Sequence, residues 1–197
     1  MRIAIELVGT SPLLCHNPQM VDPDFAINRE IKALTSKRKK TDEDQRQIEK
    51  LEWYGGIYLG AGANGDAALV PVQPTSKVRK CLINTARISK LGKSMERALS
   101  FTELHVPIAY QGPADVDALW ADPRFRSRLS VGVSGRRVIR VRPQFFPWTL
   151  KANALFIEDA GINMDEVVRI VELAGLVEGI GDNRVNGYGR FAGRVVH

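Results

Sequence analysis

The sequence predicts an α+β fold of the ferredoxin-like type, forming a single domain over residues 1–197. Three observations support this prediction. The length of 197 residues suffices for one hydrophobic core and is short for two domains. Segments with the period-two alternation of strands lie between segments with the period of amphipathic helices. When an insertion at about residues 24–72 is set aside, the order contains strand-helix-strand-strand-helix-strand, which is the ferredoxin-like plan, with one extra strand.

The chain opens with a predicted strand. Over residues 2–9, the apolar residues Ile3, Ile5 and Leu7 alternate with less apolar ones. Alternation with a period of two is typical of a strand with one buried face. We therefore expect this strand to lie in the main sheet.

The insertion is predicted to be mainly helical. From about residue 28 to residue 53 the pattern is that of helices, and Thr41 followed by Asp44 indicates a capping box. A hairpin over residues 55–73, turning at residues 64–66, ends the insertion. Apolar residues are few in the helical part, chiefly Ile31, Leu34, Ile48 and Leu51. We therefore expect a polar helical pair outside the core, which lies over the domain or reaches toward a partner.

The rest of the chain supplies the remaining elements. Thr75 begins a helix with an apolar stripe on one side and basic residues on the other. A second long helix is expected at residues 165–179, and a short helix with a turn at residues 115–125. Strands are expected at residues 101–112, 136–148, 149–157 and 190–196. We expect the two long helices to cover one face of the sheet and to leave the other for extra elements or a ligand.

The charge is unevenly distributed along the chain. The formal net charge is +6, but residues 77–97 carry seven basic residues and one acid, and residues 124–142 carry seven arginines and no acid. The rest of the chain is therefore net acidic. Such segregation is typical of a polyanion-binding face on an acidic body, although solvated faces of a helix and a hairpin give the same pattern.

Composition and motifs argue against several classes of protein. No apolar run reaches the roughly 18 residues of a spanning helix, and no cleavage-site pattern follows the first residues. We expect a cytoplasmic protein with no membrane partner. Cys15 and Cys81 lack metal-binding spacing, and the glycine-rich stretch at residues 178–195 follows a helix and precedes a strand, unlike nucleotide-binding loops. We therefore expect no cofactor and no metal.

Five stretches of the chain carry a resemblance to a known family. They are "GTSPLLCHN", "LEWYGGIYL", "LWADPRF", "RVRPQFFPW" and "GIGDNRVNGYGRF". Together they resemble an uncharacterised family of phage and prophage proteins, and the match runs over nearly the whole chain. If the protein is phage-encoded, its cytoplasmic location is that of the bacterial host cell.

A wider resemblance is to the RAMP superfamily of CRISPR effector complexes. It rests on "ELVGTSPLL", which is similar to the opening strand and turn of the backbone subunits, and on the glycine-rich loop between the last helix and the last strand. The resemblance implies one RAMP-like domain that polymerises along a guide RNA.

The leading hypothesis for function is non-catalytic binding of single-stranded nucleic acid, RNA rather than DNA, through its phosphate backbone. Glycines let backbone N–H groups approach a phosphate, while arginines supply charge and Tyr188 a stacking surface. In the alternative without a ligand, the loop only connects the last helix to the edge of the sheet, and Asp182 pairs with Arg184. The predicted binding residues are Lys77, Arg79, Lys80, Arg87 and Lys90 in the basic helix, Arg136, Arg137, Arg140 and Arg142 in the arginine strand, and Gly181, Arg184, Tyr188 and Arg190 in the loop.

Two other functions stay open. A metal-independent endoribonuclease would use His16 as its catalytic candidate, together with Tyr188 or Lys80, because a general base needs a partner acid. A phage-encoded interaction protein would act on a host or phage nucleoprotein complex. Aromatic residues beside basic ones can stack bases or anchor the core; they are Trp53, Tyr54, Tyr58, Phe145, Phe146 and Trp148.

A homo-oligomer is the expected assembly. The polar insertion buries too little apolar surface to order itself alone, and "KRKK" at residues 37–40 makes its tip basic. In backbone RAMP subunits, similar insertions reach the neighbouring copy or its bound strand. We therefore expect cooperative oligomers or filaments on nucleic acid, unless the arm folds over its own sheet.

Overall fold

A computed structural model of the chain describes residues 1–62, 69–133 and 135–196. By its internal contacts the chain divides into two compact units. The first unit contains residues 1–13, 59–111 and 146–197, and the second contains residues 14–58 and 112–145. The predicted insertion at residues 24–72 therefore coincides with neither unit, because its helical part lies in the second and its hairpin in the first.

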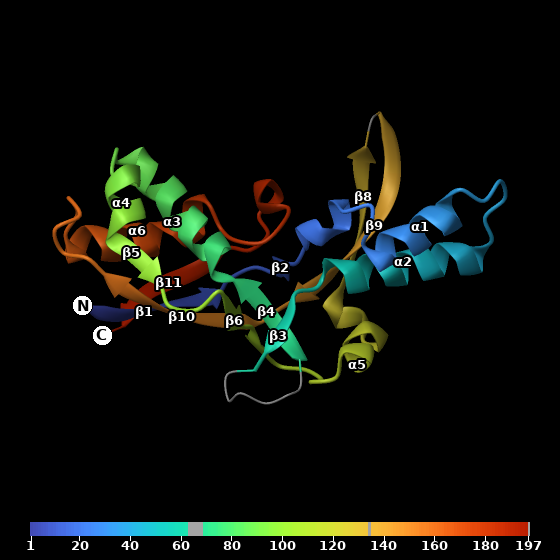
Figure 1. The fold of residues 1–197 in the computed structure, drawn as a ribbon, viewed down its shortest axis with the longest axis horizontal. Helices are drawn as coiled ribbons and strands as arrows, with labels where there is room; N and C mark the ends of the chain where they lie inside the picture. The colour runs from blue at the N-terminus through green and yellow to red at the C-terminus, as the bar shows by residue number, and fades with distance from the viewer. Residues whose placement is uncertain (63–68, 134, 197) are drawn as a thin grey trace. The chain divides into compact units, whose positions relative to one another are not determined.

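The first unit is built on an antiparallel sheet of order β11-β1-β10-β5 (Figure 1). Its strands are β1 (Arg2–Gly9), β5 (Leu99–Phe101), β10 (Trp148–Phe156) and β11 (Phe191–Val196), and β7 (Ala109–Tyr110) pairs with β10 at a further position. In the register, Ile5 lies opposite Ala152 and Leu7 opposite Gly193. The predicted strand at residues 2–9 is confirmed in the centre of this sheet.

Helices cover one face of this sheet (Figure 1). They are α3 (Thr75–Ile88), α4 (Gly92–Ala98) and α6 (Met164–Val177). Ile5, Leu7, Leu82, Val167 and Phe191 are buried in the resulting core. Asn163 caps α6 through a capping box with Glu166. Both long helices begin where the sequence predicts, because their apolar stripes and start signals are local in the chain.

A second sheet of the first unit has the order β3-β4-β6. Its strands are β3 (Leu59–Ala61), β4 (Leu69–Pro74) and β6 (His105–Pro107). The predicted hairpin forms between β3 and β4, while its turn at residues 64–66 lies outside the described residues. The single strand predicted at residues 101–112 is wrong, because β5 and β7 pair with β10 whereas β6 pairs with β4.

The second unit combines helices with an arginine-rich hairpin. Its helical elements are η1 (Pro18–Val21), α1 (Ala26–Thr35), α2 (Asp42–Gly56), α5 (Val116–Ala121) and η2 (Pro123–Phe125). Strands β8 (Arg126–Val133) and β9 (Arg136–Phe145) pair antiparallel, and β2 (Leu13–Leu14) completes the order β2-β9-β8. The capping box of Thr41 and Asp44 at α2 is confirmed. The sequence had indicated β9 but not β8 as a strand.

Helix α2 is part of the core of the second unit, which corrects the prediction of a polar pair outside any core. Ile48, Leu51 and Trp53 are buried, and the indole Nε1 of Trp53 donates to the carbonyl of Phe125 at 2.8 Å. In contrast, α1 contains no buried residue. The apolar count underestimated α2 because it did not include Trp53 near the helix end.

Candidate nucleic-acid interface

The glycine-rich loop is anchored firmly to the turn after β1. The Gly189 N–H donates to the carbonyl of Pro12 at 2.8 Å, and the Ser11 hydroxyl donates to the carbonyl of Gly187 at 2.8 Å. Gly189 has a φ of +66°, and a Cβ there would lie 1.7 Å from the carbonyl oxygen of Ile180. Glycine is therefore required at this position by both conformation and space. These contacts and the conformation of Gly189 define the shape of the loop.

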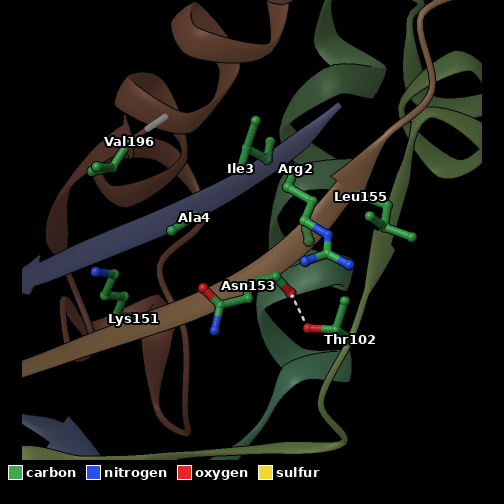
Figure 2. A pocket seen from close by; sticks show the side chains of 9 residues that line it. Arg2, Ile3, Ala4, Thr102, Lys151, Asn153, Leu155 and Val196 are labelled. Carbon is green, nitrogen blue, oxygen red and sulfur yellow. Dashed lines mark hydrogen bonds between the residues drawn. The ribbon is translucent and has the colours of Figure 1, made fainter.

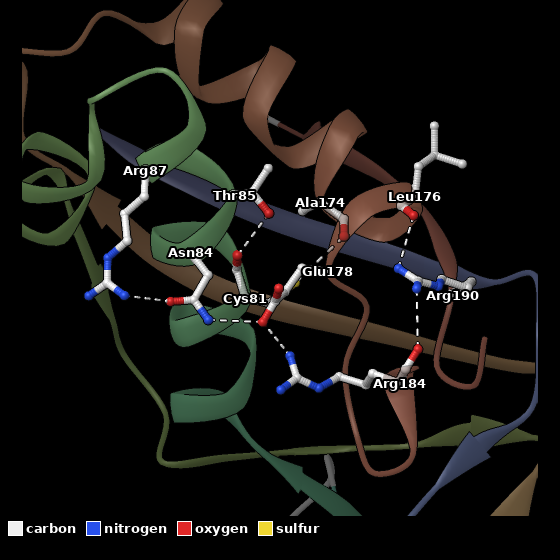
Figure 3. Close-up of polar contacts among 9 residues, drawn as sticks. All are labelled: Cys81, Asn84, Thr85, Arg87, Ala174, Leu176, Glu178, Arg184 and Arg190. Carbon is white, nitrogen blue, oxygen red and sulfur yellow. Dashed lines mark hydrogen bonds and ion pairs between the residues drawn. The ribbon is translucent and has the colours of Figure 1, made fainter. Parts of the chain in front are cut away.

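A polar network joins the loop to α3 and α6 (Figure 3). The Arg184 guanidinium forms an ion pair with the Glu178 carboxylate, which also accepts from the Asn84 amide at 2.9 Å. Burial alone raises the pKa of Glu178, but the hydrogen bonds from Asn84 and Arg184 outweigh it and lower that pKa. Neither Glu178 nor Asn84 was among the residues predicted from the sequence. The position of Glu178 is the signal in the sequence that could have identified it. An acid at the negative end of a helix dipole is unfavourable, so a carboxylate there needs a cationic or hydrogen-bonding partner.

Arg190 has a structural role within the same network (Figure 3). Its guanidinium donates to the carbonyl of Leu176 at 2.9 Å and to the carbonyl of Arg184 at 3.2 Å. The last carbonyls of a helix lack intrahelical donors, and a nearby cation satisfies them. Of the predicted loop residues, Arg190 therefore holds the loop to the end of α6. Tyr188, two residues earlier in the chain, is half-buried.

A cavity of about 180 Å³ lies between α3 and the glycine-rich loop. Its lining residues are Lys77, Lys80, Cys81, Gly179, Ile180, Gly181 and Arg184. The Cys81 thiol is buried, which raises its pKa to about 12. A thiol with so high a pKa stays neutral and is a poor nucleophile at pH 7. The cavity therefore offers cationic side chains and glycine backbone, but no reactive thiolate. Cationic side chains and backbone N–H groups are suited to binding a phosphate.

The remaining basic residues of α3 differ in their environments. Arg79 donates to the carbonyl of Glu96 at 2.7 Å, and Arg87 donates to the Asn84 side chain at 3.0 Å. Lys90 is exposed just beyond the helix, with a φ of 61°. Lys77 and Lys80 are thus the members of the predicted basic helix that the structure brings to the cavity.

The arginines of the second unit are largely engaged by residues of the same unit. Arg140 pairs with Glu52, and Arg128 pairs with Glu49 at 3.0 Å. Arg137 donates to the carbonyl of Ser130 at 3.3 Å. The side chain of Arg136 lies outside the description. Helix α2 therefore offsets part of the positive charge of the hairpin, which the linear sequence does not reveal.

Strand β9 does not belong to the sheet that α3 and α6 cover. Arg140 and Arg142 therefore do not lie on the open face of that sheet. Both instead line a cavity of about 340 Å³ within the second unit, together with His16, Met20, Asn28, Ile31, Glu52 and Val141. His16 is exposed, and its carbonyl accepts from the Tyr58 hydroxyl at 2.8 Å. Tyr188 and Lys80, the predicted companions of His16, belong to the first unit.

The open face of the main sheet carries a different set of side chains (Figure 2). A cavity of about 570 Å³ there is lined by Arg2, Ile3, Ala4, Thr102, Lys151, Asn153, Ala154, Leu155 and Val196. None of these described lining residues is aromatic. Sheet faces that read single-stranded RNA use aromatic rings to stack bases. This cavity therefore lacks the chemistry of a base-stacking sheet.

Most of the candidate stacking residues are core residues. Trp53, Tyr58, Phe145 and Trp148 are all buried. Phe146 is 52% exposed, and Tyr54 is half-buried with its hydroxyl bonded to Asp117. The core alternative thus holds for the buried four.

Within residues 1–62, 69–133 and 135–196, no cluster of three or more His, Cys, Asp or Glu side chains is arranged to hold a metal ion. In that same part of the chain, no helix has both the length and the apolar character needed to cross a membrane.

Comparisons with known proteins bear on the fold. No protein-family model and no curated protein matches the chain. Among solved structures, it is similar to a chain of a "Type IV-B CRISPR Complex", with a TM-score of 0.51, 8% identity and coverage of 100% of this chain and 90% of that one. It is also similar to a chain of the "Type III-B Cmr-beta bound to cognate target RNA", with a TM-score of 0.49, 12% identity and coverage of 99% and 60%.

At so low an identity, the first likeness shows the fold alone. The chain has a mixed α+β fold similar to that of a chain of the "Type IV-B CRISPR Complex". The resemblance to phage and prophage proteins remains a prediction.

Proposed function

We propose that the protein binds single-stranded nucleic acid, RNA in preference to DNA, through its phosphate backbone and without catalysis. The observation that carries the proposal is the cavity between α3 and the glycine-rich loop. Lys77 and Lys80 lie on one side of it, and Gly179 and Gly181 with Arg184 on the other. Phosphate contacts from lysines and glycine backbone are typical of sequence-independent binding.

The position of the lysines supports a bound anion. Lys77 is the third residue of α3, and the first turn of α3 contains no acidic residue. A cation near the positive end of a helix dipole is unfavourable by about 0.3–1 kcal/mol, whereas an anion there is stabilised. A phosphate in the cavity would interact favourably with both the lysines and the helix end.

The arrangement of strands supports a ferredoxin-like, RAMP-like core in the first unit. In chain order, β1, α3, β5, β10, α6 and β11 follow the strand-helix-strand-strand-helix-strand plan. In the sheet, the fourth of these strands lies beside the first, followed by the third and the second. The glycine-rich loop then lies between the last helix and the last strand of this core.

Cooperative homo-oligomers on the strand are part of the proposal. The similar chain from the "Type IV-B CRISPR Complex" is a part of an assembly, which supports it. Helix α1 buries no residue and therefore has surface to offer a neighbouring copy. The basic segment at residues 37–40 follows α1 directly.

Metal-independent RNA cleavage is a second candidate function. The observation that favours it is that exposed His16 shares a cavity with Arg140 and Arg142. An imidazole can act as a general base toward a 2′-hydroxyl, and arginines can stabilise the charge that develops on the phosphate.

One experiment separates these functions. Labelled RNA and single-stranded DNA are incubated with the protein, with and without EDTA, and are examined for retention and for cleavage products. Retention of intact strands, with RNA retained more tightly, supports binding. Products that persist in EDTA and disappear in His16→Ala would assign cleavage instead. If the assay shows neither retention nor cleavage products, both functions are overturned and a protein-interaction role is favoured.

A further inference from the structure

We infer that the open face of the main sheet is a docking surface for a second copy of the chain, and that two copies form a symmetric dimer there. The inference does not depend on nucleic acid. Helices α3, α4 and α6 cover the opposite face (Figure 1), whereas the open face carries the cavity of about 570 Å³ (Figure 2). Arg2 of β1 and Lys151 of β10 line this cavity, and none of its described lining residues is acidic. The face therefore suits a partner that brings carboxylates.

Strand β10 and the turn after it carry a row of exposed side chains that runs from a cation through apolar residues to acids. Burial alternates along β10, and its exposed residues are Lys151, Asn153 and Leu155. Ile157 follows in the same alternation, and two exposed acids stand at residues 158–159. Leu155 is 42% exposed and Ile157 is 51% exposed. Exposed apolar surface rimmed by polar residues is typical of a contact between proteins, and this row has in addition an opposite charge at each end.

The row is complementary in charge to a reversed copy of itself. Lys151 precedes Leu155 by four residues, and Asp159 follows Leu155 by four residues. A two-fold axis at Leu155 therefore sets Lys151 of each copy against Asp159 of the other and brings the two Leu155 side chains together. In such a contact the same patch serves both copies, and each interaction occurs twice. The cations Arg2 and Lys151 of one copy then balance the acids Glu158 and Asp159 of the other in number.

The charges at the two ends of the row are not used within one copy. In the part of the chain that the structure describes, neither Lys151 nor Asp159 belongs to an ion pair. Glu6 lies opposite Lys151 in the register, but it pairs with Arg194 of β11. Exposed ion pairs add little free energy, while complementary charges fix the orientation of a contact. We therefore expect a weak dimer that Lys151 and Asp159 orient.

Reversal of the charges tests the pairing. The full-length protein without nucleic acid is examined by analytical ultracentrifugation over a range of concentrations, and we expect a monomer–dimer equilibrium that weakens with salt. Lys151→Glu and Asp159→Lys should each weaken the dimer by about tenfold or more, because each creates two contacts between like charges. An equimolar mixture of the two variants should dimerise like the intact protein, since both contacts regain opposite charges. Lys93→Glu makes the same change of charge at an exposed site of α4 and should have no effect.

Three results of this experiment would overturn the inference. They are a monomer at every concentration of the intact protein, a dimer that neither reversal weakens, and a mixture of the reversed variants that stays monomeric while the intact protein dimerises. Circular dichroism and thermal unfolding show that each variant is folded. If a charge-reversed variant does not fold, a cysteine at position 155 decides the question instead.

A cysteine at position 155 tests the two-fold axis itself. The two native cysteines, Cys15 and Cys81, are buried, so an introduced thiol at the surface is the one that reacts. Leu155→Cys should form a disulfide-linked dimer under a mild thiol oxidant, because the axis brings the two positions together. Leu173→Cys is the control, since Leu173 lies on α6 and is 37% exposed. No cross-link at position 155, or equal cross-linking at both positions, would contradict the symmetric contact.

The dimer is separable from the proposed binding of a nucleic-acid strand. Lys77→Ala with Lys80→Ala should lose strand binding and keep the dimer, whereas Lys151→Glu should lose the dimer and keep strand binding. A dimer of the intact protein without any strand binding would support this inference and overturn the proposed function alone. Strand binding by a protein that is monomeric in the absence of nucleic acid would overturn this inference alone.

Discussion

The guanidinium of Arg184 donates to the carboxylate of Glu178, and this contact holds the glycine-rich loop to the end of α6. Asn84 of α3 donates to the same carboxylate at 2.9 Å. Two helices and the loop therefore meet at one acidic group. Because the cavity with Lys77 and Lys80 lies between α3 and this loop, Glu178 maintains the shape of the site that we propose for phosphate.

Replacing Glu178 with Gln should destabilise the protein in a pH-dependent way. The pKa of Glu178 is lowered in the folded state. Its contribution is therefore present above the unfolded pKa of about 4.3 and is lost as the pH falls through the folded value. We expect a loss of about 1 kcal/mol in the free energy of unfolding at neutral pH, since the carboxylate is partly exposed. The difference should shrink as the pH falls through that folded value. Urea unfolding across this range measures it.

Glu172→Gln is the control, because it removes an exposed carboxylate from the same helix. It should leave the free energy of unfolding nearly unchanged at every pH. A Glu178→Gln difference that does not shrink as the pH is lowered would show that shape, and not charge, explains the effect.

Two glycines of the loop should respond differently to alanine. Gly189 has a φ of +66° and an added Cβ would meet the Ile180 carbonyl at 1.7 Å, whereas Gly187 has a φ of +84° with nothing within 4 Å. Gly187→Ala incurs only backbone strain, about 1 kcal/mol. Gly189→Ala adds a clash and should cost about 2–5 kcal/mol. Thermal and urea unfolding compare them, and equal losses would contradict the packing described for Gly189.

The buried carboxylate of Glu52 in the second unit should contribute more to the free energy of unfolding than an exposed carboxylate of the same helix. Glu52→Ala leaves the Val141 N–H and Arg140 without their partner, and we expect a loss of about 2–4 kcal/mol in the free energy of unfolding. Glu43 pairs with Arg46 at the surface, where both side chains are at least 70% exposed. Glu43→Ala should therefore change stability by less than about 0.5 kcal/mol. Similar losses in the two variants would refute the buried role of Glu52.

Assembly on nucleic acid is best tested at the basic segment of residues 37–40, between α1 and α2. Replacing residues 28–52 would remove Ile48, Leu51 and Glu52 from the core of the second unit, so such a deletion would unfold it. Changing Arg38, Lys39 and Lys40 to Ser keeps the ion pair of Lys37 with Asp44 at 2.5 Å. We expect the intact protein to add subunits as oligonucleotides lengthen, and the variant to add them less cooperatively. Light scattering measures the masses.

Two outcomes of the mass measurement would count against the proposal. A mass of one subunit on every length of oligonucleotide would rule out assembly by the intact protein. The same series of masses for both proteins would show that the basic residues 38–40 take no part in assembly.

Local signals in the sequence predicted local structure well. The alternation of Ile3, Ile5 and Leu7 predicted β1, and Thr41 with Asp44 predicted the start of α2. Such signals act within one helical turn or along one strand. The placement of Lys77 and Lys80 on one helix was accessible for the same reason, since their spacing is that of neighbours on a helix surface.

Pairing between residues far apart in the chain was not predicted from the sequence. The division of residues 101–112 among strands depends on β4 and β10, which lie elsewhere in the chain. The partners of the arginines were also hidden, because Glu52 is 88 residues from Arg140. Charge counted along the chain therefore overstated the positive surface of the second unit and missed the compensation by α2.

The dependence of binding on salt tests the central claim most directly. Affinity for a single strand is measured by fluorescence anisotropy over a range of salt concentrations, for the intact protein, for Lys77→Ala with Lys80→Ala, and for Lys151→Ala. The slope of log affinity against log salt is about −0.7 for each phosphate neutralised. Loss of the two cavity lysines should therefore weaken binding and make the slope shallower by about 1.4. Lys151 lines the open face of the sheet instead, and its replacement should change the slope little. Affinity that is flat with salt, or an equal effect of Lys151→Ala, would contradict phosphate binding at the cavity between α3 and the glycine-rich loop.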